Sequence, residues 1–465
     1  MKKLLLIAFT LFCVVVCLLP SVGMLFNPTD KPIGNERQTP APSITQKDGS
    51  FNYKYFTELG GYYEKHFAYR PEMIQTDADI QSKCFFTSNI DTVVVGNNDW
   101  LYYTSSTDDY LGKNTLSGGE ISGVKHNLEI IQSYCRANGV NFLFTVAPNK
   151  NTLYPDNMPY TYSAKVSGTH NRDLLHSVLE DSEVNYCNLF EPLSNQDETL
   201  YFARDSHWNN KGALLAYNTI LTQLNQPHDD YSSAEVTRRK DFTGDLSNML
   251  YPVSSEPEYN YYYGAEKNYS YTTDTKSVED TLIQTANPNA SGKLYMYRDS
   301  FGNALVPFFA SAYNSATFTK SFPMNIRQEF ASDKPDTFVM ELVERNIKWL
   351  ITMPPMLPAP EHSIFKTEGT LEGSAAVKVK PCDYAAEYTQ FSAVIDSPDQ
   401  GSDAEYYITV KDQSGAEKTF ETFSYKSEDG NGFIAYLPAE QFPSEGSYEI
   451  KILVKNKDGF YELRS

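Results

Sequence analysis

The sequence predicts an α/β fold with a mainly parallel sheet, followed by an antiparallel β-sandwich. Between about residues 120 and 352, short apolar runs alternate with segments that repeat apolar residues every three or four positions. This alternation is typical of a parallel sheet covered by helices on both faces. After residue 375 the helical spacing ends, and alternating segments are separated by turns rich in Asp, Gly, Ser and Pro. The 465 residues suffice for two domains, each with its own core.

The individual elements follow from these patterns. Helices are expected at residues 121–138, 171–180, 210–224 and 303–312, and an amphipathic helix within 51–86. Strands are expected at 140–147, 184–189, 294–297, 337–342 and 348–352, with a hairpin at 93–103. In the last ninety or so residues, strands are expected at 390–395, 405–411, 432–437 and 447–454.

The N-terminal segment indicates where the chain resides. Two lysines precede an apolar run at residues 4–26, which as a helix would span about 34 Å, enough for a hydrocarbon core of about 30 Å. We interpret residues 1–26 as a transmembrane signal anchor that leaves a single-pass protein with its remaining domains outside the cell membrane. The alternative is a signal peptide cleaved near Ser21-Val22-Gly23, which would release a secreted protein. Residues 27–50 are polar and without periodicity, which predicts a flexible linker.

Composition narrows the classes of partner. A net charge of −20 argues against a nucleic-acid partner, which would need a basic face. The 34 tyrosines suit sugar binding, because a ring stacks on a pyranose face, although exported proteins are often rich in Tyr. The cysteines outside the apolar run are scattered and form no CxxC pair, so a metal is not expected. They are compatible with one or two disulfides or with buried thiols.

Two short blocks carry the chemistry. Ser300 stands between a strand-like run and a helix-like run, where its Oγ would be lifted clear of the sheet beside helix-start N–H groups. Asp205 and His207 are two positions apart and face the same side of an extended chain, so the carboxylate can orient the imidazole. Together they match the logic of an activated serine and predict acyl transfer. The alternative is structural: Ser300 as a helix cap, and His207 as a core histidine paired with Asp205.

The combination of blocks resembles the DHHW proteins and the related bacterial alginate O-acetylation proteins, which have SGNH-hydrolase-like folds. The matching blocks are residues 62–70 (YYEKHFAYR), 96–103 (GNNDWLYY), 205–209 (DSHWN) and 299–302 (DSFG), with weaker matches at 147–150, 244–246 and 335–345. The resemblance implies an SGNH-hydrolase-like three-layer fold, which we assign to a catalytic domain at residues 51–375. One departure is Arg298, which stands where the family commonly has Gly.

The resemblance also implies a function. Catalytic Ser300, His207 and Asp205 would transfer an acyl group, usually acetyl, to an exported polysaccharide acceptor, with the acyl group supplied by a separate multi-span membrane acyltransferase and without a cofactor. Two alternatives stay open: a glycan O-acetylesterase with the same triad, and a non-catalytic glycan-binding wall protein.

Further site residues are expected from their positions. Asn149 follows a strand end and Arg327 lies downstream of Ser300, so both are candidates for binding the oxyanion or substrate. Trp208 is a candidate for excluding water from the site. The Tyr-rich segment 251–272 is either a flap over the site or a surface hairpin. The β-sandwich at residues 376–465 is either carbohydrate-binding, by analogy with the alginate proteins, or a spacer.

Overall fold

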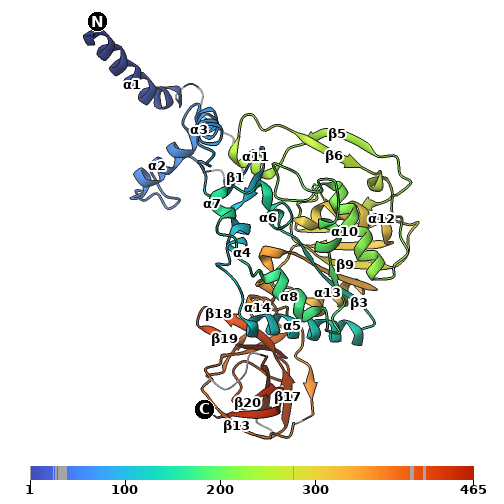
Figure 1. The fold of residues 1–465 in the computed structure, drawn as a ribbon. Helices are drawn as coiled ribbons and strands as arrows, with labels where there is room; N and C mark the ends of the chain where they lie inside the picture. Colours follow the sequence, from blue (N-terminus) through green and yellow to red (C-terminus); the bar gives the residue numbers. More distant parts are fainter. Residues whose placement is uncertain are drawn as a thin grey trace.

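The computed structural model describes residues 2–24, 26, 29, 39–275, 277–363, 365–397, 403–411 and 415–464. A long N-terminal helix projects from one end of an α/β domain, and an all-β domain lies at the opposite end (Figure 1). The predicted fold class, an α/β domain with a mainly parallel sheet followed by an antiparallel β-sandwich, is confirmed.

A mainly parallel sheet forms the centre of the α/β domain. Within the described residues it has seven strands in the order β4-β3-β11-β9-β10-β8-β7. The first five strands in this order run parallel, and β8 and β7 extend the sheet antiparallel. The strand bounds are Asn141–Ala147 (β3), Tyr186–Asn188 (β4), Ser270–Tyr271 (β7), Leu282–Ala286 (β8), Lys293–Tyr297 (β9), Ser315–Thr319 (β10) and Thr337–Val343 (β11).

Alternate residues of these strands face opposite sides, so each face of the sheet buries its own core. Phe144 and Met340 pack on one face with residues of α5, α8 and α13. Leu143 and Val339 pack on the other face with residues of α10 and α12. The helix bounds are Gly118–Ala137 (α5), Asn171–Leu179 (α8), Asn210–Gln223 (α10), Val306–Ala312 (α12) and Ile326–Asp333 (α13). Figure 1 shows the resulting three layers, as expected from the sequence.

The N-terminal region contains three helices, α1 (Lys2–Met24), α2 (Tyr55–His66) and α3 (Arg70–Cys84), and the expected hairpin of β1 (Val93–Val95) and β2 (Leu101–Tyr103). In the described part of the chain, α1 is the one helix long and apolar enough to cross a membrane, a test that a signal sequence also meets. The expected linker at 27–50 falls largely outside the described residues, because 27–28 and 30–38 are not among them.

The C-terminal domain consists of two facing sheets. In the described residues their orders are β12-β17-β16-β20-β21-β13 and β14-β15-β19-β18, antiparallel except for the β13–β21 pair. Its first strand begins at Glu361, before the predicted boundary at residue 376. The strand bounds are Glu361–His362 (β12), Gly369–Glu372 (β13), Lys378–Pro381 (β14), Tyr388–Val394 (β15), Glu405–Lys411 (β16), Glu417–Glu421 (β17), Phe423–Ser427 (β18), Gly430–Pro438 (β19), Glu449–Asn456 (β20) and Gly459–Arg464 (β21).

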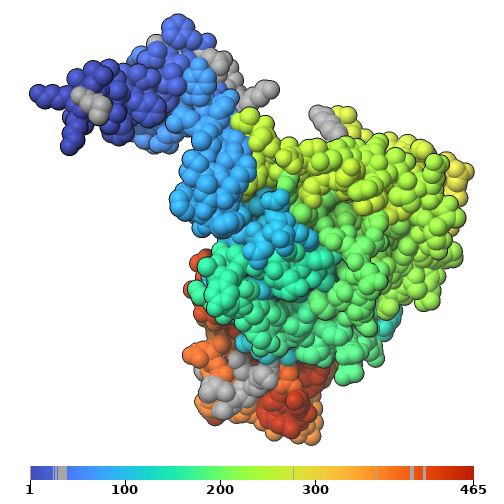
Figure 2. All heavy atoms as spheres, turned by 45° about the horizontal axis from the view of Figure 1, so that its top comes forward, coloured from blue at the N-terminus to red at the C-terminus, as the bar shows by residue number. Residues whose placement is uncertain are grey.

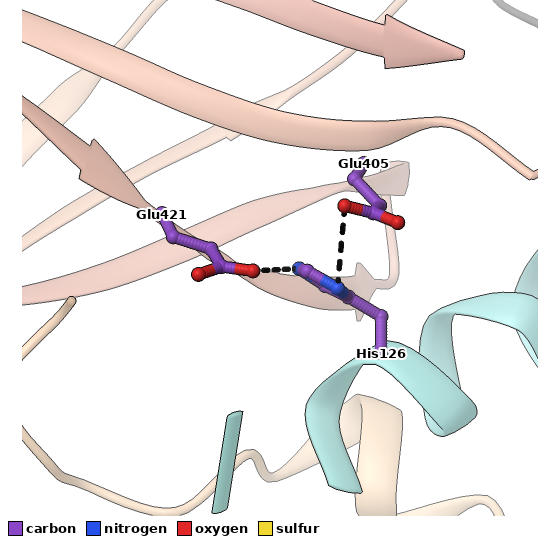
Figure 3. A group of neighbouring side chains, drawn as sticks. All are labelled: His126, Glu405 and Glu421. Carbon is purple, nitrogen blue, oxygen red and sulfur yellow. Dashed lines mark ion pairs between the residues drawn. The ribbon is translucent and has the colours of Figure 1, made fainter. Parts of the chain in front are cut away.

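A polar contact from α5 joins the two domains. The His126 ring, almost fully buried, lies between two carboxylates of the C-terminal domain (Figure 3). Its Nδ1 is 3.7 Å from Glu405 Oε2 and its Nε2 is 3.7 Å from Glu421 Oε1. These three residues are close enough to one another to be considered as ligands of one cation. Since each ring nitrogen faces a different carboxylate, the arrangement fits a bridging imidazole better than a single metal ion.

One expected strand is wrong. Residues 348–352 do not form a strand, because α14 (Trp349–Thr352) is a short helix. Ile347, Leu350 and Ile351 are buried at positions i, i+3 and i+4, the spacing of one helical face, so the apolar run is helical. All six cysteines are free.

Candidate active site

Ser300, His207 and Asp205 form a continuous chain of hydrogen bonds. The Nε2 of His207 is 2.8 Å from Ser300 Oγ, and its Nδ1 is 2.7 Å from Asp205 Oδ1. Ser300 and His207 come from segments 93 residues apart in the sequence. The structure therefore brings together the three residues that the sequence selected, with the spacing that a serine, base and orienting carboxylate require.

A tight local hairpin presents Asp205 and His207. Tyr201 and Trp208 form a bridge across it, and the Phe202 N–H donates to the His207 carbonyl at 3.3 Å. The His207 N–H also donates to Asp205 Oδ1, at 2.8 Å, which fixes the carboxylate against the backbone that carries the imidazole. Asn209 ends the hairpin by capping α10, since its Oδ1 accepts the Lys211 and Gly212 N–H groups in the first turn of that helix.

The Gly244-Asp245 block holds the same hairpin from outside. The Asp245 N–H donates to Asp205 Oδ2 at 2.7 Å, and the Ser206 hydroxyl donates to Asp245 Oδ2 at 2.7 Å. A Cβ at Gly244 would lie 2.3 Å from the Arg204 carbonyl oxygen, so only glycine permits this close approach. Both oxygens of Asp205 are thus occupied, one by His207 and one by Asp245.

The electrostatics favour an ionised Asp205 beside a basic imidazole. Burial favours neutral Asp205, but the charge and hydrogen bond of His207 outweigh it and lower the pKa of Asp205 to about 2. Burial likewise disfavours charged His207, but Asp205 and then Asp245 outweigh it and raise the pKa of His207 above its ordinary value. Burial and the negative charge of Asp205 raise the pKa of Asp245.

Ser300 follows the end of β9 and begins the 3₁₀ turn η4 (Phe301–Ala304) before α12. Its neighbour Asp299 is a structural residue: Oδ1 accepts the Phe301 N–H at 2.9 Å, and Oδ2 accepts the Val343 N–H at 2.7 Å. These bonds tie the serine turn to the end of β11.

Arg298, the departure from the family pattern, is fully buried beneath this turn. Its guanidinium donates to the Asn303 side chain and to the carbonyl oxygens of Val278 (3.0 Å) and Asp280 (3.1 Å). A Cβ at Gly302 would lie 2.5 Å from Arg298 Cβ, so the glycine that follows the serine makes room for the arginine that precedes it. The turn is therefore supported by Arg298 in place of a small residue.

The carboxyl ends of three adjacent strands, β3, β11 and β9, meet beside the serine. A pocket of about 360 Å³ lies there, and its lining includes Ser300 and Arg345. Arg345 Nη1 is 3.4 Å from Asn149 Oδ1, and its guanidinium lies over the Phe301 ring at 5.7 Å. Among the described residues, the buried Nδ2 of Asn149 has no hydrogen-bond partner. The pocket lining also includes Lys320 and three aromatic rings, those of Tyr103, Phe322 and Trp349.

Lys150 is buried behind the Asp205–His207 hairpin, with 3% of its surface exposed. Its Nζ donates to the carbonyl oxygens of Leu101 (2.6 Å), Ala203 (2.6 Å) and Asp205 (2.9 Å). The ammonium also lies 4.8 Å from the Trp100 ring centre. Burial lowers the pKa of Lys150, while nearby carboxylates, Asp205 first, oppose that effect. Lys150, from the block at residues 147–150, thereby links the blocks at 96–103 and 205–209.

Two other expected site residues, Trp208 and Arg327, are not among the described residues that line the pocket. Trp208 is 1% exposed and donates from Nε1 to the Phe301 carbonyl at 3.0 Å, so it braces the serine turn and does not face solvent. Arg327 is exposed on α13, 5.9 Å from the Tyr388 ring, and is not among the described residues that line the pocket beside Ser300.

The Tyr-rich segment contributes a surface hairpin. β6 (Glu258–Tyr262) pairs with β5 (Thr237–Phe242), and Glu258 accepts the N–H groups of Ala203 and Arg204 at 2.8 Å each. β6 therefore supports the Asp205–His207 hairpin, and none of its residues is among the described residues that line the pocket beside Ser300.

Asp205, His207 and Asp245 are close enough to be considered as metal ligands. The 2.7 Å separation of His207 Nδ1 and Asp205 Oδ1 is that of a hydrogen bond. It is shorter than the roughly 3.3 Å expected between two ligands about 2.05 Å from a tetrahedral zinc ion. The geometry therefore fits a proton between these two atoms.

Comparisons with known proteins agree with the resemblance. Residues 93–291 match the family model of the SGNH hydrolase-like domain, acetyltransferase AlgX. The matched range contains Asp205 and His207 and ends before Ser300. No curated protein matches the sequence. The chain is similar to the solved structure of Bacillus cereus PatB1 (18% identity, TM-score 0.44, 56% of this chain and 97% of that chain).

Two further solved structures are similar. One is a DHHW family protein from Eubacterium siraeum (16% identity, TM-score 0.41, 55% of this chain and 95% of that chain). The other is Pseudomonas aeruginosa AlgX (10% identity, TM-score 0.34, 83% of this chain and 97% of that chain). The family-model match confirms, over residues 93–291, the similarity to an SGNH hydrolase-like acetyltransferase domain that the sequence blocks indicated.

Proposed function

We propose that this protein is a serine-dependent O-acetyltransferase that modifies an exported cell-surface or cell-wall polysaccharide. The observation that carries the proposal is the hydrogen-bonded chain from Ser300 through His207 to Asp205. The match of residues 93–291 to an acetyltransferase family model supports the choice of acyl group.

The first half-reaction acylates the serine. His207 Nε2 takes the Ser300 hydroxyl proton as Oγ attacks the carbonyl carbon of an acyl ester or thioester donor. The tetrahedral intermediate collapses, the bond from that carbon to the donor's leaving group breaks, and the leaving group takes the proton from His207. Asp205 stabilises the imidazolium that exists between these two transfers.

The second half-reaction releases the acyl group to the acceptor. A sugar hydroxyl gives its proton to His207 and attacks the acyl carbon. The bond from that carbon to Ser300 Oγ then breaks, and the serine oxygen regains a proton from His207. The enzyme returns to its starting state with one acyl group moved from donor to sugar.

The oxyanion of both intermediates needs donors near Ser300. We assign this role to the Ser300 N–H and to the Asn149 side chain, whose buried Nδ2 has no partner among the described residues. Arg345, which lines the pocket and contacts Asn149 Oδ1, adds positive charge on the same side. Loss of one such donor typically slows a reaction about a hundredfold to a thousandfold.

The pocket suits a sugar acceptor. Tyr103, Phe322 and Trp349 offer aromatic faces for a pyranose ring, and Lys320 and Arg345 offer hydrogen bonds to its substituents. We further propose that α1 is an uncleaved single-pass anchor and that a multi-span membrane acyltransferase supplies the acyl group. The proposal also includes a polysaccharide as the acceptor and carbohydrate binding by residues 376–465.

The test uses the full chain in nanodiscs with p-nitrophenyl acetate as donor and neutral, N-acetylated or uronic-acid oligosaccharides as acceptors. Acetylated oligosaccharide from the wild type, and none from Ser300→Ala, is the expected result. Ser177→Ala, at an exposed position on α8, is the matched control. Release of acetate without any acetylated acceptor would assign the protein as an esterase. Equal activity of Ser300→Ala and wild type would rule out the catalytic proposal.

A further inference from the structure

Helix α2 and the start of α3 expose an apolar face next to the N-terminal helix. The exposed side chains are Tyr53, Phe56, Leu59, Tyr63, Tyr69 and Met73, and we call them the apolar platform. Phe56 is 77% exposed and Tyr53 is 88% exposed. Phe56, Leu59 and Tyr63 are spaced i, i+3 and i+7, so they share one face of α2. A soluble domain rarely exposes a row of large apolar side chains such as Phe56, Leu59 and Tyr63 on one helix face.

The platform is attached to the last turn of α1. The Ser21 Oγ is 2.6 Å from the Tyr63 hydroxyl, and the Ala68 N–H donates to the Pro20 carbonyl at 3.3 Å. A Cβ at Gly23 would lie 2.7 Å from Ala68 Cβ, so the two segments are in close contact. The depth of α1 in a membrane therefore sets the depth of the platform.

With α1 across the membrane, the platform lies at the extracytoplasmic surface of that membrane. α1 has 23 residues, which as a helix span about 34 Å, close to a hydrocarbon core of about 30 Å. With Lys2 and Lys3 on the cytoplasmic side, the turn that contains Ser21 reaches the outer boundary of the core. Tyr63, in contact with Ser21, is then placed among the headgroups, where tyrosine is enriched in membrane proteins.

The second half of α3 fixes the platform to the α/β domain. Ala78 packs with Val93, Leu101 and Leu246 in a small core. The Tyr251 hydroxyl donates to Ser82 Oγ at 2.9 Å. Figure 2 shows the blue N-terminal helices as a lobe that stands apart from the body of the molecule. The lobe therefore connects the anchor to the catalytic domain through packed contacts, in addition to the chain itself.

The charges near the platform favour an apolar interaction. Glu58 and Glu64 on α2 offset Lys65 and the preceding Lys54, so residues 54–66, all of which the structure describes, form no basic cluster that would bind anionic lipids. Phenylalanine, leucine and tyrosine side chains instead suit the boundary between headgroups and acyl chains, where amphipathic helices bury their apolar face about 5–10 Å deep.

We propose that the apolar platform lies on the outer lipid surface of the membrane beside α1 and holds the catalytic domain at a fixed orientation above the bilayer. The proposal rests on the proposed anchor role of α1 and is independent of the acyl-transfer chemistry. Lipid therefore contacts the apolar platform, and the experiment below distinguishes this from contact with a protein partner.

The experiment measures quenching of tryptophan fluorescence by brominated phosphatidylcholine in nanodiscs that contain the full chain. Phe56→Trp and Leu59→Trp place a reporter on the platform, and Leu282→Trp places one at an exposed apolar position of β8. The wild-type chain corrects for the three native tryptophans. We expect the platform reporters to be quenched at least about twofold more than the Leu282→Trp control.

A charged variant sharpens the test. With Tyr53→Trp as reporter, Phe56→Asp combined with Leu59→Asp should reduce its quenching to the control level, because charged groups leave the apolar boundary. Platform reporters quenched no more than Leu282→Trp would overturn the proposal and leave a protein partner as the occupant of this face. Intact-mass measurement of the purified chain separates this failure from a cleaved α1, which would overturn the anchor role itself.

Discussion

The ammonium of Lys150 lies 2.9 Å from the backbone carbonyl oxygen of Asp205. The same ammonium donates to the carbonyl oxygens of Leu101 and Ala203, so one buried charge fixes the hairpin of Asp205 and His207 against β2 and the end of β3. Lys150 does not contact Ser300 in the structure. It positions the catalytic base through the backbone on which that base is carried.

Lys150→Met should therefore lower both stability and catalysis. The change removes the Lys150 donor from the Leu101 and Asp205 carbonyl oxygens, whereas the Ala203 carbonyl still accepts the Leu101 N–H. Because each buried group left without a partner costs about 1–3 kcal/mol, we expect a loss of at least about 2 kcal/mol in the free energy of unfolding. In protein that remains folded, kcat for ester hydrolysis should fall more than KM rises, because the base is misplaced. Thermal unfolding and steady-state kinetics measure the two effects. Lys165→Met, at an exposed position, should match the wild type.

The pH dependence should report His207. Neutral His207 is the form that accepts the serine proton, so kcat/KM is expected to rise with pH through the pKa of this imidazole. Because Asp205 and Asp245 raise that pKa, the midpoint should lie above the ordinary histidine value of about 6.5. Asp245→Asn removes one negative charge and should move the midpoint to lower pH.

The control for this profile is Asp77→Asn, at an exposed position of α3, which should leave the midpoint unchanged. An Asp245→Asn profile that superimposes on the wild type would contradict the electrostatic role of Asp245. Loss of all activity in Asp245→Asn would instead indicate that its hydrogen bonds to Ser206 dominate.

Gly302→Ala should disturb the serine turn. The new Cβ would lie 2.5 Å from Arg298 Cβ and 3.0 Å from Glu341 Oε2, and neither neighbour has room to move because both are fully buried. Overpacking of this kind typically costs about 1–3 kcal/mol. We expect a lower melting temperature and reduced acylation of Ser300, measured by intact mass after reaction with p-nitrophenyl acetate.

The matched control is Gly118→Ala at the start of α5, where a Cβ meets nothing within 4 Å. This variant should retain the wild-type melting temperature. Equal behaviour of the two alanine variants would show that the turn tolerates a larger residue beside Arg298.

The sequence predicted those parts of the structure that depend on local pattern. The parallel strands β3, β9 and β11 were expected from apolar runs, and their alternate residues do face two separate cores. The apolar run at residues 348–352 was misassigned because a short run fits a strand and a helical turn equally well. Its i, i+3 and i+4 spacing, starting at Ile347, was the signal available for a helix.

The site was predictable where the residues lie in short blocks. Asp205 and His207 are two residues apart, and Ser300 follows a strand, so pattern and family resemblance together selected them. Lys150 and Asp245 act through backbone groups of a hairpin that forms only in the folded chain, and no local pattern indicates such contacts. Arg327 shows the converse, since its position after Ser300 in the sequence does not bring it to the pocket lining among the described residues.

The His126 ring lies between the carboxylates of Glu405 and Glu421 at the junction of the two domains. His126→Ala would remove the group that separates these two carboxylates and would leave the buried Thr422 carbonyl, now 3.2 Å from Nε2, without this donor. Like charges would then face each other at the junction between α5 and the C-terminal domain. We expect a loss of about 1–3 kcal/mol in the free energy of unfolding, measured in denaturant, and faster proteolysis between the domains. His176→Ala, at a partly exposed position of α8, should show neither effect, and the same stability in both variants would mean that the junction does not depend on the imidazole.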